Sequence, residues 1–354
     1  MSTQVAPLVE EGALRLSRNQ LVRRARRRPR RRHALVIAGL SVALLGAFAA
    51  RVLLGDFTYT VPDFFRIVGG AEIPGATYIL MESKLPRAVL GVLVGVAFGV
   101  GGAIFQATLR NPLASPDIIG VSAGASAAAV VAIVILGLDD AAVSVAAVVG
   151  AVGVAATVRL VAGPATGYRL VLVGVGLAAA LQSVIQYVFT RADEYDAHLV
   201  LRWLTGSLGR ADWPTIRILG LALLMLLPLV VWLSRSLRIT ELGPDVAAGL
   251  GVGPRRTDAL LLVAVVLVAL AVAAAGPVAF VSFLAGPIAR ALNRGRTTLL
   301  GAGLTGAAIV VASDYVADYL LADINFPVGV VTGALGAPFL LWLLASGRTG
   351  RTRT

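Results

Sequence analysis

Long apolar stretches recur along the sequence, and they constrain the fold more than any other feature. A helix needs about 20 apolar residues to cross a bilayer, and ten stretches approach that length. Inside lipid a single segment must satisfy its own backbone hydrogen bonds, which a helix does. The sequence therefore predicts an all-α polytopic membrane protein with one transmembrane domain over residues 34–345. The ten predicted spans are residues 34–54, 87–109, 118–137, 141–162, 169–190, 213–234, 257–275, 278–294, 297–319 and 328–345.

Composition agrees with this assignment and excludes several chemistries. Charged residues make up 14% of the chain, against about 25% in soluble domains. There is no cysteine, so the chain cannot form a disulfide, a thiolate metal site or a cysteine nucleophile. The histidines, His33 and His198, lie far apart, and the single lysine, Lys84, is not part of a Walker A loop. We expect no catalytic residues, no metal site and no bound cofactor in this chain.

The arginines are distributed unevenly, which predicts the topology. Residues 1–33 form an Arg-rich tail that we expect to be disordered because like charges repel. The tail and the first apolar stretch also resemble a signal peptide, with a possible cleavage site at residues 47–49, but an uncleaved first helix is favoured. The net charge of +12 is better explained by topology and anionic membrane lipid than by nucleic acid.

The positive-inside rule then places both termini, including the tail 346–354, in the cytoplasm. The least secure span is 278–294, which is short and contains Pro287. The inner loops would hold Arg110, Arg159, Arg169, Arg235, Arg238, Arg255, Arg256, Arg290, Arg294 and Arg296. The outer loops would hold Asp139, Asp140, Asp193, Glu194, Asp196, Asp212 and Asp323, with Arg66, Arg191, Arg202 and Arg210 as exceptions.

The stretch 84–126 is the most distinctive part of the sequence. A Lys-Leu-Pro-Arg step leads into an apolar helix with glycines at positions 91, 95 and 99 and a lone Gln106. Pro112 and Pro116 follow, and each fixes φ and removes a backbone donor, so the helix must end here. The glycine stripe suits close packing within the chain or a pore-facing groove. Gln106 fits either an interhelical hydrogen bond or a polar path for substrate.

Several motifs, in order, resemble the FecCD family, the permease subunits of ABC importers for ferric siderophores, haem and vitamin B12. They are LPR at 85–87, Gly102 with Gln106, RNPLASPDIIGVSAGA at 110–125, GPVAFVSFLAGPIAR at 276–290, and the Phe-Pro-Val-Gly to Gly-Ala-Pro-Phe ending at 326–339. The resemblance covers roughly residues 55–345. It implies an inverted repeat of helices 2–5 and 7–10, and a location in the cytoplasmic membrane of a bacterium.

The resemblance also implies functional residues. Asn111 and Leu113 would form one half of a cytoplasmic gate, Thr166, Gly167 and Tyr168 the other half, and Gln106 would lie on the translocation path. Lys84 and Arg87 would dock the substrate-binding protein, although snorkelling at the membrane interface is the simpler explanation. The coupling loop 237–256 would seat on an ATPase through Glu241, Gly243, Asp245, Ala247, Ala248, Gly249, Leu250 and Gly251.

Two features leave the interpretation open. The family's usual Gly and His are Ser282 and Ile288 here, which suggests pairing with a paralogue, while a homodimer stays possible. Asp314 and Asp318 lie one turn apart in a span, where acidic residues are rare and functional by default. Structural or interfacial roles, lining of the path, and proton coupling are all compatible with them.

These observations predict a permease subunit that imports a ferric siderophore. Its expected partners are a second permease subunit, two ATPase subunits that bind ATP and magnesium, and an extracytoplasmic substrate-binding protein. Haem or cobalamin is an alternative cargo. An ion-coupled secondary transporter is the alternative of a different class, and only Asp314 and Asp318 could supply its titratable relay.

Overall fold

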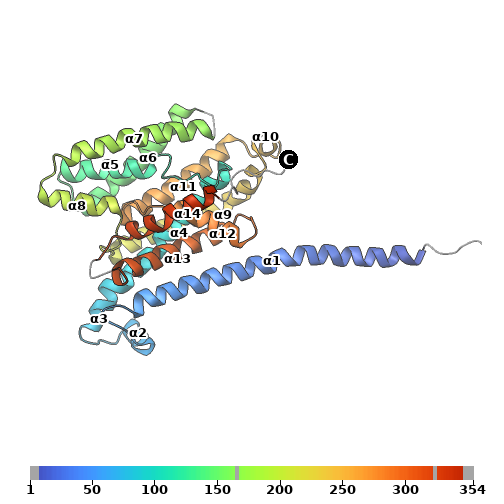
Figure 1. The fold of residues 1–354 in the computed structure, drawn as a ribbon, viewed down its shortest axis with the longest axis horizontal. Helices are drawn as coiled ribbons and strands as arrows, with labels where there is room; N and C mark the ends of the chain where they lie inside the picture. The colour runs from blue at the N-terminus through green and yellow to red at the C-terminus, as the bar shows by residue number, and fades with distance from the viewer. Residues whose placement is uncertain (1–7, 164–166, 322–324, 346–354) are drawn as a thin grey trace, which may run out of the picture.

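The computed structural model describes residues 8–163, 167–321 and 325–345, and within these ranges it contains helices and no strand (Figure 1). The prediction of an all-α polytopic membrane protein is confirmed. The helices are α1 (Leu8–Leu53), α2 (Val61–Val68), α3 (Ala76–Tyr78), the π-helical η1 (Ile79–Lys84), α4 (Leu85–Thr108), α5 (Val121–Val134), α6 (Asp140–Ala162), α7 (Tyr168–Phe189), α8 (Glu194–Thr205), α9 (Trp213–Thr240), α10 (Pro244–Gly249), α11 (Pro254–Ala275), α12 (Val281–Leu292), α13 (Leu299–Tyr319) and α14 (Val328–Ala345).

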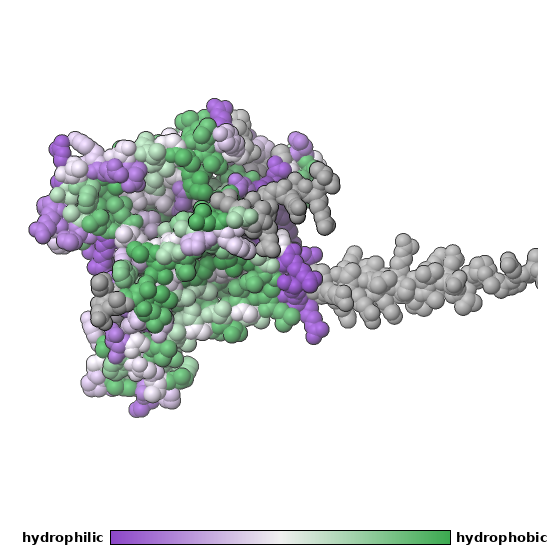
Figure 2. All heavy atoms as spheres, viewed as in Figure 1, coloured by the Kyte–Doolittle hydropathy of each residue, from purple (hydrophilic) through white to green (hydrophobic). Residues whose placement is uncertain are grey.

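Each of the ten predicted spans contains a helix. In the part of the chain that the structure describes, seven helical segments are long and apolar enough to cross a membrane, and α5, α12 and the apolar part of α14 are shorter. Apolar side chains cover the flanks of the bundle, and hydrophilic ones gather towards its ends (Figure 2). This band is typical of a protein with lipid around it. We name the ends by their short helices, the α2 end and the α10 end.

Helix α1 is longer than the predicted first span. It continues through the Arg-rich run back to Leu8 and extends away from the bundle (Figure 1). Arginine is a good helix former. Because the adjacent span is already helical, the Arg-rich run can extend that helix without a separate, unfavourable nucleation step. At the α10 end, Arg32 donates hydrogen bonds of 3.2 and 3.0 Å to the carbonyl oxygen of Leu292 at the end of α12.

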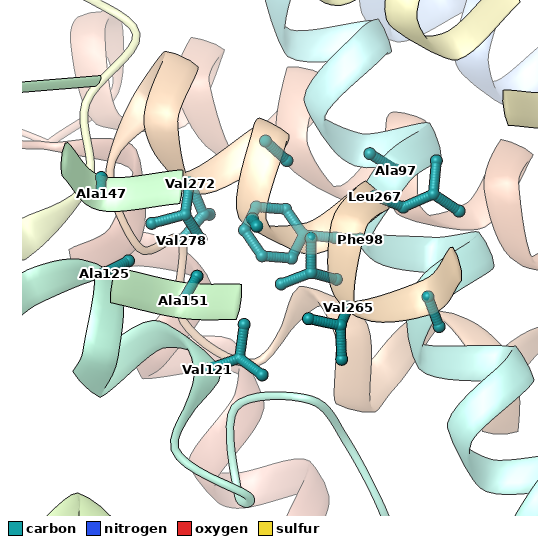
Figure 3. Packing of buried hydrophobic residues seen from close by; sticks show 14 of the residues in the cluster. Ala97, Phe98, Val121, Ala125, Ala147, Ala151, Val265, Leu267, Val272 and Val278 are labelled. Carbon is teal, nitrogen blue, oxygen red and sulfur yellow. The ribbon is translucent and has the colours of Figure 1, made fainter. Parts of the chain in front are cut away.

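Helix α4 is the central element, because α13, α11, α12 and α9 all pack on it. Its glycine stripe allows α13 to approach closely. A Cβ on Gly95 would lie 2.5 Å from the carbonyl oxygen of Gly306, and one on Gly99 would collide with the carbonyl of Ala302. The stripe therefore packs within the subunit, against α13. On another face, Ala97 and Phe98 of α4 meet Val265 and Leu267 of α11 (Figure 3).

Two of the short helices share an unusual start. Helix α5 follows Gly120 with φ +88°, and α12 follows Phe280 with φ +64°. A left-handed backbone conformation is unfavourable for Phe, so tertiary contacts must hold Phe280 in it. In both places the next two residues are Val and Ser. The order of a long helix, a short helix and two further helices thus occurs twice, in α4–α7 and in α11–α14.

Candidate functional site

The two predicted gate segments lie together at the α10 end. A pocket there is lined by Leu109, Asn111, Gly167, Tyr168 and Val171. Residues from the loop after α4 and from the start of α7 thus share one hollow. The Tyr168 side chain is exposed, and Thr166 lies outside the described residues.

The loop after α4 forms a compact elbow, which we define as residues 110–117. The backbone amide of Leu113 donates to Asn111 Oδ1 over 2.9 Å, so the Asn side chain closes an Asx turn. Arg110 has a φ of +52°, because the chain reverses directly before Pro112. The side chain of Leu113 packs on Phe283 and Leu284 of α12. The elbow is therefore supported by α12 as well as by its own hydrogen bonds.

Gln106 is buried between α4 and α12, and its amide is fully engaged. Nε2 donates to the carbonyl oxygen of Phe283 over 3.0 Å, and Arg290 Nη2 donates to Oε1 over 2.9 Å. Gly286 leaves room for this amide, since a Cβ there would collide with it. In this conformation Gln106 links α4 to α12 through hydrogen bonds. Its place on a substrate path stays a prediction.

Asp117 is a further polar residue of this region, and sequence reasoning missed it. The hydroxyls of Ser122 and Ser282 donate to its two carboxylate oxygens. Burial raises the pKa of Asp117 above its ordinary value, and both hydroxyl hydrogen bonds act in the opposite direction. The Val-Ser pair that recurs at 121–122 and 281–282 was the signal in the sequence that could have suggested it.

At the α2 end, four charged side chains from three helices form a closed cluster. Arg51 of α1 contacts Asp314 through Nε and Oδ2 over 2.6 Å, and Asp318 through Nη2 and Oδ2 over 3.0 Å. Arg87 of α4 contacts the remaining oxygens, Oδ1 of Asp314 and Oδ1 of Asp318, each over 3.0 Å. The side chains of Arg51 and Asp314 are each 1% exposed. We call Arg51, Arg87, Asp314 and Asp318 the charge quartet.

Lys84 lies beside the quartet and is also buried. Its ammonium group donates to the carbonyl oxygen of Leu54 over 2.7 Å and to that of Phe57. These carbonyls belong to the turn that follows α1, so Lys84 stabilises the connection to α2. The structure therefore brings both predicted docking residues, Lys84 and Arg87, into contacts within the chain.

The predicted coupling residues lie at the opposite end, around α10. Ala247 is buried, whereas Glu241, Asp245, Ala248, Gly249, Leu250 and Gly251 are exposed. Gly243 is the N-cap of α10 and has a φ of +108°. The guanidinium of Arg110 lies close to it, since Arg110 Nη1 would be 3.3 Å from a Cβ at Gly243. The coupling loop and the gate elbow are thus neighbours.

Helix α7 carries exposed polar groups within a membrane span. Gln182, Ser183 and Gln186 are exposed and lie on adjacent turns. In lipid an amide without a partner costs several kcal/mol. This face of α7 therefore requires a polar neighbour that the single chain does not supply among the described residues.

Comparison with known proteins places these features in a family. The model of the FecCD transport family matches residues 41–346. The ferric enterobactin transport system permease protein FepG of Escherichia coli K12 is 36% identical, and the match covers 82% of this chain and 89% of that protein. The achromobactin transport system permease protein CbrC of Dickeya dadantii is also 36% identical, with 93% and 97% covered.

Other matches extend the range of relatives. The vitamin B12 import system permease protein BtuC of Yersinia pseudotuberculosis is 31% identical, with 92% and 97% covered. A solved structure of an inward-facing metal-chelate type ABC transporter shares the fold, with a TM-score of 0.76 at 23% identity, and covers 88% of this chain and 99% of its own. By the extent of the family match and the similarity of its relatives, this chain belongs to the FecCD transport family.

Proposed function

We propose that this chain is the membrane-spanning permease subunit of an ABC importer that moves a ferric siderophore across the bacterial cytoplasmic membrane. The relatives named for ferric enterobactin and achromobactin transport support this cargo. ATP and magnesium are bound by two separate ATPase subunits, and cargo is delivered by a substrate-binding protein. The α10 end, with its arginines, faces the cytoplasm, as do both termini.

Three exposed apolar residues of the coupling loop carry this proposal. Leu242, Val246 and Leu250 follow one another at intervals of four residues and are 60%, 49% and 59% exposed. They lie in and beside a short helix outside the predicted spans, where lipid does not cover them. Large apolar side chains exposed close together in the sequence suggest a protein interface. This surface fits a cleft on the ATPase subunit.

Replacing Leu250 with Asp tests the interface. A charge in an apolar cleft loses the burial of a leucine and is itself desolvated, so we expect about 100-fold weaker binding of the ATPase. The measurement is co-purification and affinity of the co-expressed ATPase subunit. Val68→Asp, an equally exposed apolar residue at the α2 end, is the control. Unchanged binding by Leu250→Asp would remove α10 as the coupling element.

The gate is assigned to the α10 end, and the substrate path to Gln106 and the polar face of α7. Asn111, Leu113 and residues 166–168 open and close the inner exit. Gln106 lies on the path and holds α4, the helix before the elbow, in place. The polar face at Gln182, Ser183 and Gln186 lines the path against a second permease subunit, either a paralogue or a second copy.

Docking of the substrate-binding protein is assigned to Lys84 and Arg87 at the α2 end. Because Lys84 is only 3% exposed and both residues already have partners within the chain, their contribution to docking is small. Lys84→Ala should weaken binding of that protein slightly, and Lys84→Ala with Arg87→Ala should weaken it more. Full affinity of the double variant in a titration would end this assignment.

The alternative of an ion-coupled secondary transporter finds little support in the geometry. The titratable relay predicted for it consists of Asp314 and Asp318, yet each of these carboxylates contacts both Arg51 and Arg87. A carboxylate held by two guanidinium groups is a poor proton carrier, because protonation would leave the arginines buried and unpaired. Haem or cobalamin stays the alternative cargo, supported by the similarity to a vitamin B12 permease.

A further inference from the structure

Asp117 connects two helices that lie far apart in the sequence. Its Oδ1 accepts from Ser122 in the first turn of α5, and its Oδ2 accepts from Ser282 in the first turn of α12. One carboxylate thus joins the starts of the two short helices. Each start follows a left-handed residue, Gly120 or Phe280, so the two first turns present the same backbone geometry.

Burial and hydrogen bonding act on Asp117 in opposite directions, because desolvation raises the pKa of its carboxyl group and the two hydroxyl hydrogen bonds lower it. The amino end of a helix carries a partial positive charge, and unpaired backbone N–H groups point out of it. A negative group between two such ends is stabilised by both. The hydroxyls add charge-assisted hydrogen bonds, which are about twice as strong as neutral ones. Asp117 therefore holds α5 and α12 together without an arginine partner among the described residues.

Ser282 supplies the link to α12, because its hydroxyl donates to Asp117 Oδ2. The Ser282 side chain is fully buried, and Gly102 of α4 makes room for its backbone, since a Cβ there would collide with the Ser282 carbonyl. Ser282 thus contributes one specific hydrogen bond at a tight helix crossing.

The link lies next to the elbow. Asp117 is the last residue of the elbow, and Leu113 of the same elbow packs on Phe283 and Leu284, which directly follow Ser282. A polar contact and an apolar contact therefore attach one loop to the same turn of α12. The elbow can leave α12 only if both contacts break.

We propose that Asp117 and Ser282 are positioning residues that fasten the gate elbow to the first turn of α12, so that the elbow and α12 move as one unit. This rests on the proposed function in one respect, the assignment of Asn111 and Leu113 to the gate. The attachment itself is a property of the isolated chain and is measured without ATPase, cargo or binding protein.

A single introduced cysteine reports on the attachment, because the chain has none of its own. Leu113→Cys is placed in the isolated full-length protein in lipid nanodiscs, and its rate of reaction with a maleimide is measured. Adding Ser282→Ala should raise this rate about tenfold, the factor expected for losing a hydrogen bond to a charged group. Ser122→Ala is the matched control, since it removes a hydroxyl from the same carboxylate but leaves the link to α12 intact. It should change the rate less than about twofold.

A second reporter separates positioning from general loosening of the fold. Val143→Cys lies buried in α6, away from the elbow, and should react at the same slow rate with and without Ser282→Ala. Equal rates at Leu113→Cys for Ser282→Ala and Ser122→Ala would overturn the proposal. A rise at both reporters would overturn it too, because Ser282 would then stabilise the whole bundle rather than position the elbow. Failure of the link leaves the ABC importer assignment untouched.

Discussion

At the scale of single residues, the charge quartet shows what a buried ionic cluster does in a membrane protein. Two guanidinium groups and two carboxylates balance one another, and every carboxylate oxygen has an arginine partner. Arg51 also donates to the Tyr319 hydroxyl over 3.1 Å. The cluster joins α1 to α4 and α13, while Arg32 joins the same helix to α12 at the α10 end. Helix α1 is thus attached to the bundle at both Arg32 and Arg51.

Removing one charge from the quartet should lower the stability of the protein more than removing two opposite charges. Arg51→Gln leaves two carboxylates facing Arg87 alone, and breaking a buried pair costs roughly 3–5 kcal/mol. Adding Asp318→Asn restores neutrality, so the double variant should recover part of the lost stability. The thermal unfolding midpoint in detergent, followed by tryptophan fluorescence, measures both.

Arg66→Gln serves as the comparison for this pair of variants, since Arg66 is 69% exposed and 3.9 Å from Asp63. Such a pair contributes about 1 kcal/mol or less. If the double variant is less stable than Arg51→Gln alone, charge balance does not explain the quartet.

Sequence reasoning singled out three residues of this cluster, although it assigned Arg87 to docking and did not pair it with the carboxylates. Asp314 and Asp318 are conspicuous because carboxylates are rare in apolar spans. Arg51 was not recognised as their partner, because it lies 263 residues from Asp314 and ends a span where any arginine can snorkel to the interface. Local patterns carry no information about which distant helix packs alongside. The same reason hid the contact between Asp117 and Ser282.

At the scale of helices, hydropathy predicted where spans occur but not how long their helices are. Apolar composition identifies a segment that can lie in lipid, whether it is helical or not. Residues 276–280 and 116–120 are apolar for the most part yet precede α12 and α5 without helical structure. The bend in each case depends on a left-handed residue. Glycine at 120 hints at it, whereas Phe280 gives no such signal.

At the scale of the whole molecule, the two ends have different tasks. The α10 end holds the predicted coupling loop, the predicted gate hollow and the elbow, and Arg110 of the elbow lies close to Gly243 of the loop. The α2 end is tied together by the charge quartet and Lys84. Such an arrangement suits a subunit that is driven from one end while the other end holds its shape.

The most direct test of this account is uphill uptake in proteoliposomes. We predict that the chain, reconstituted with its ATPase subunits and the substrate-binding protein, accumulates a ferric siderophore only when ATP is supplied. The chain alone should accumulate none under an imposed proton or sodium gradient. Accumulation by the chain alone, driven by an ion gradient, would contradict the account.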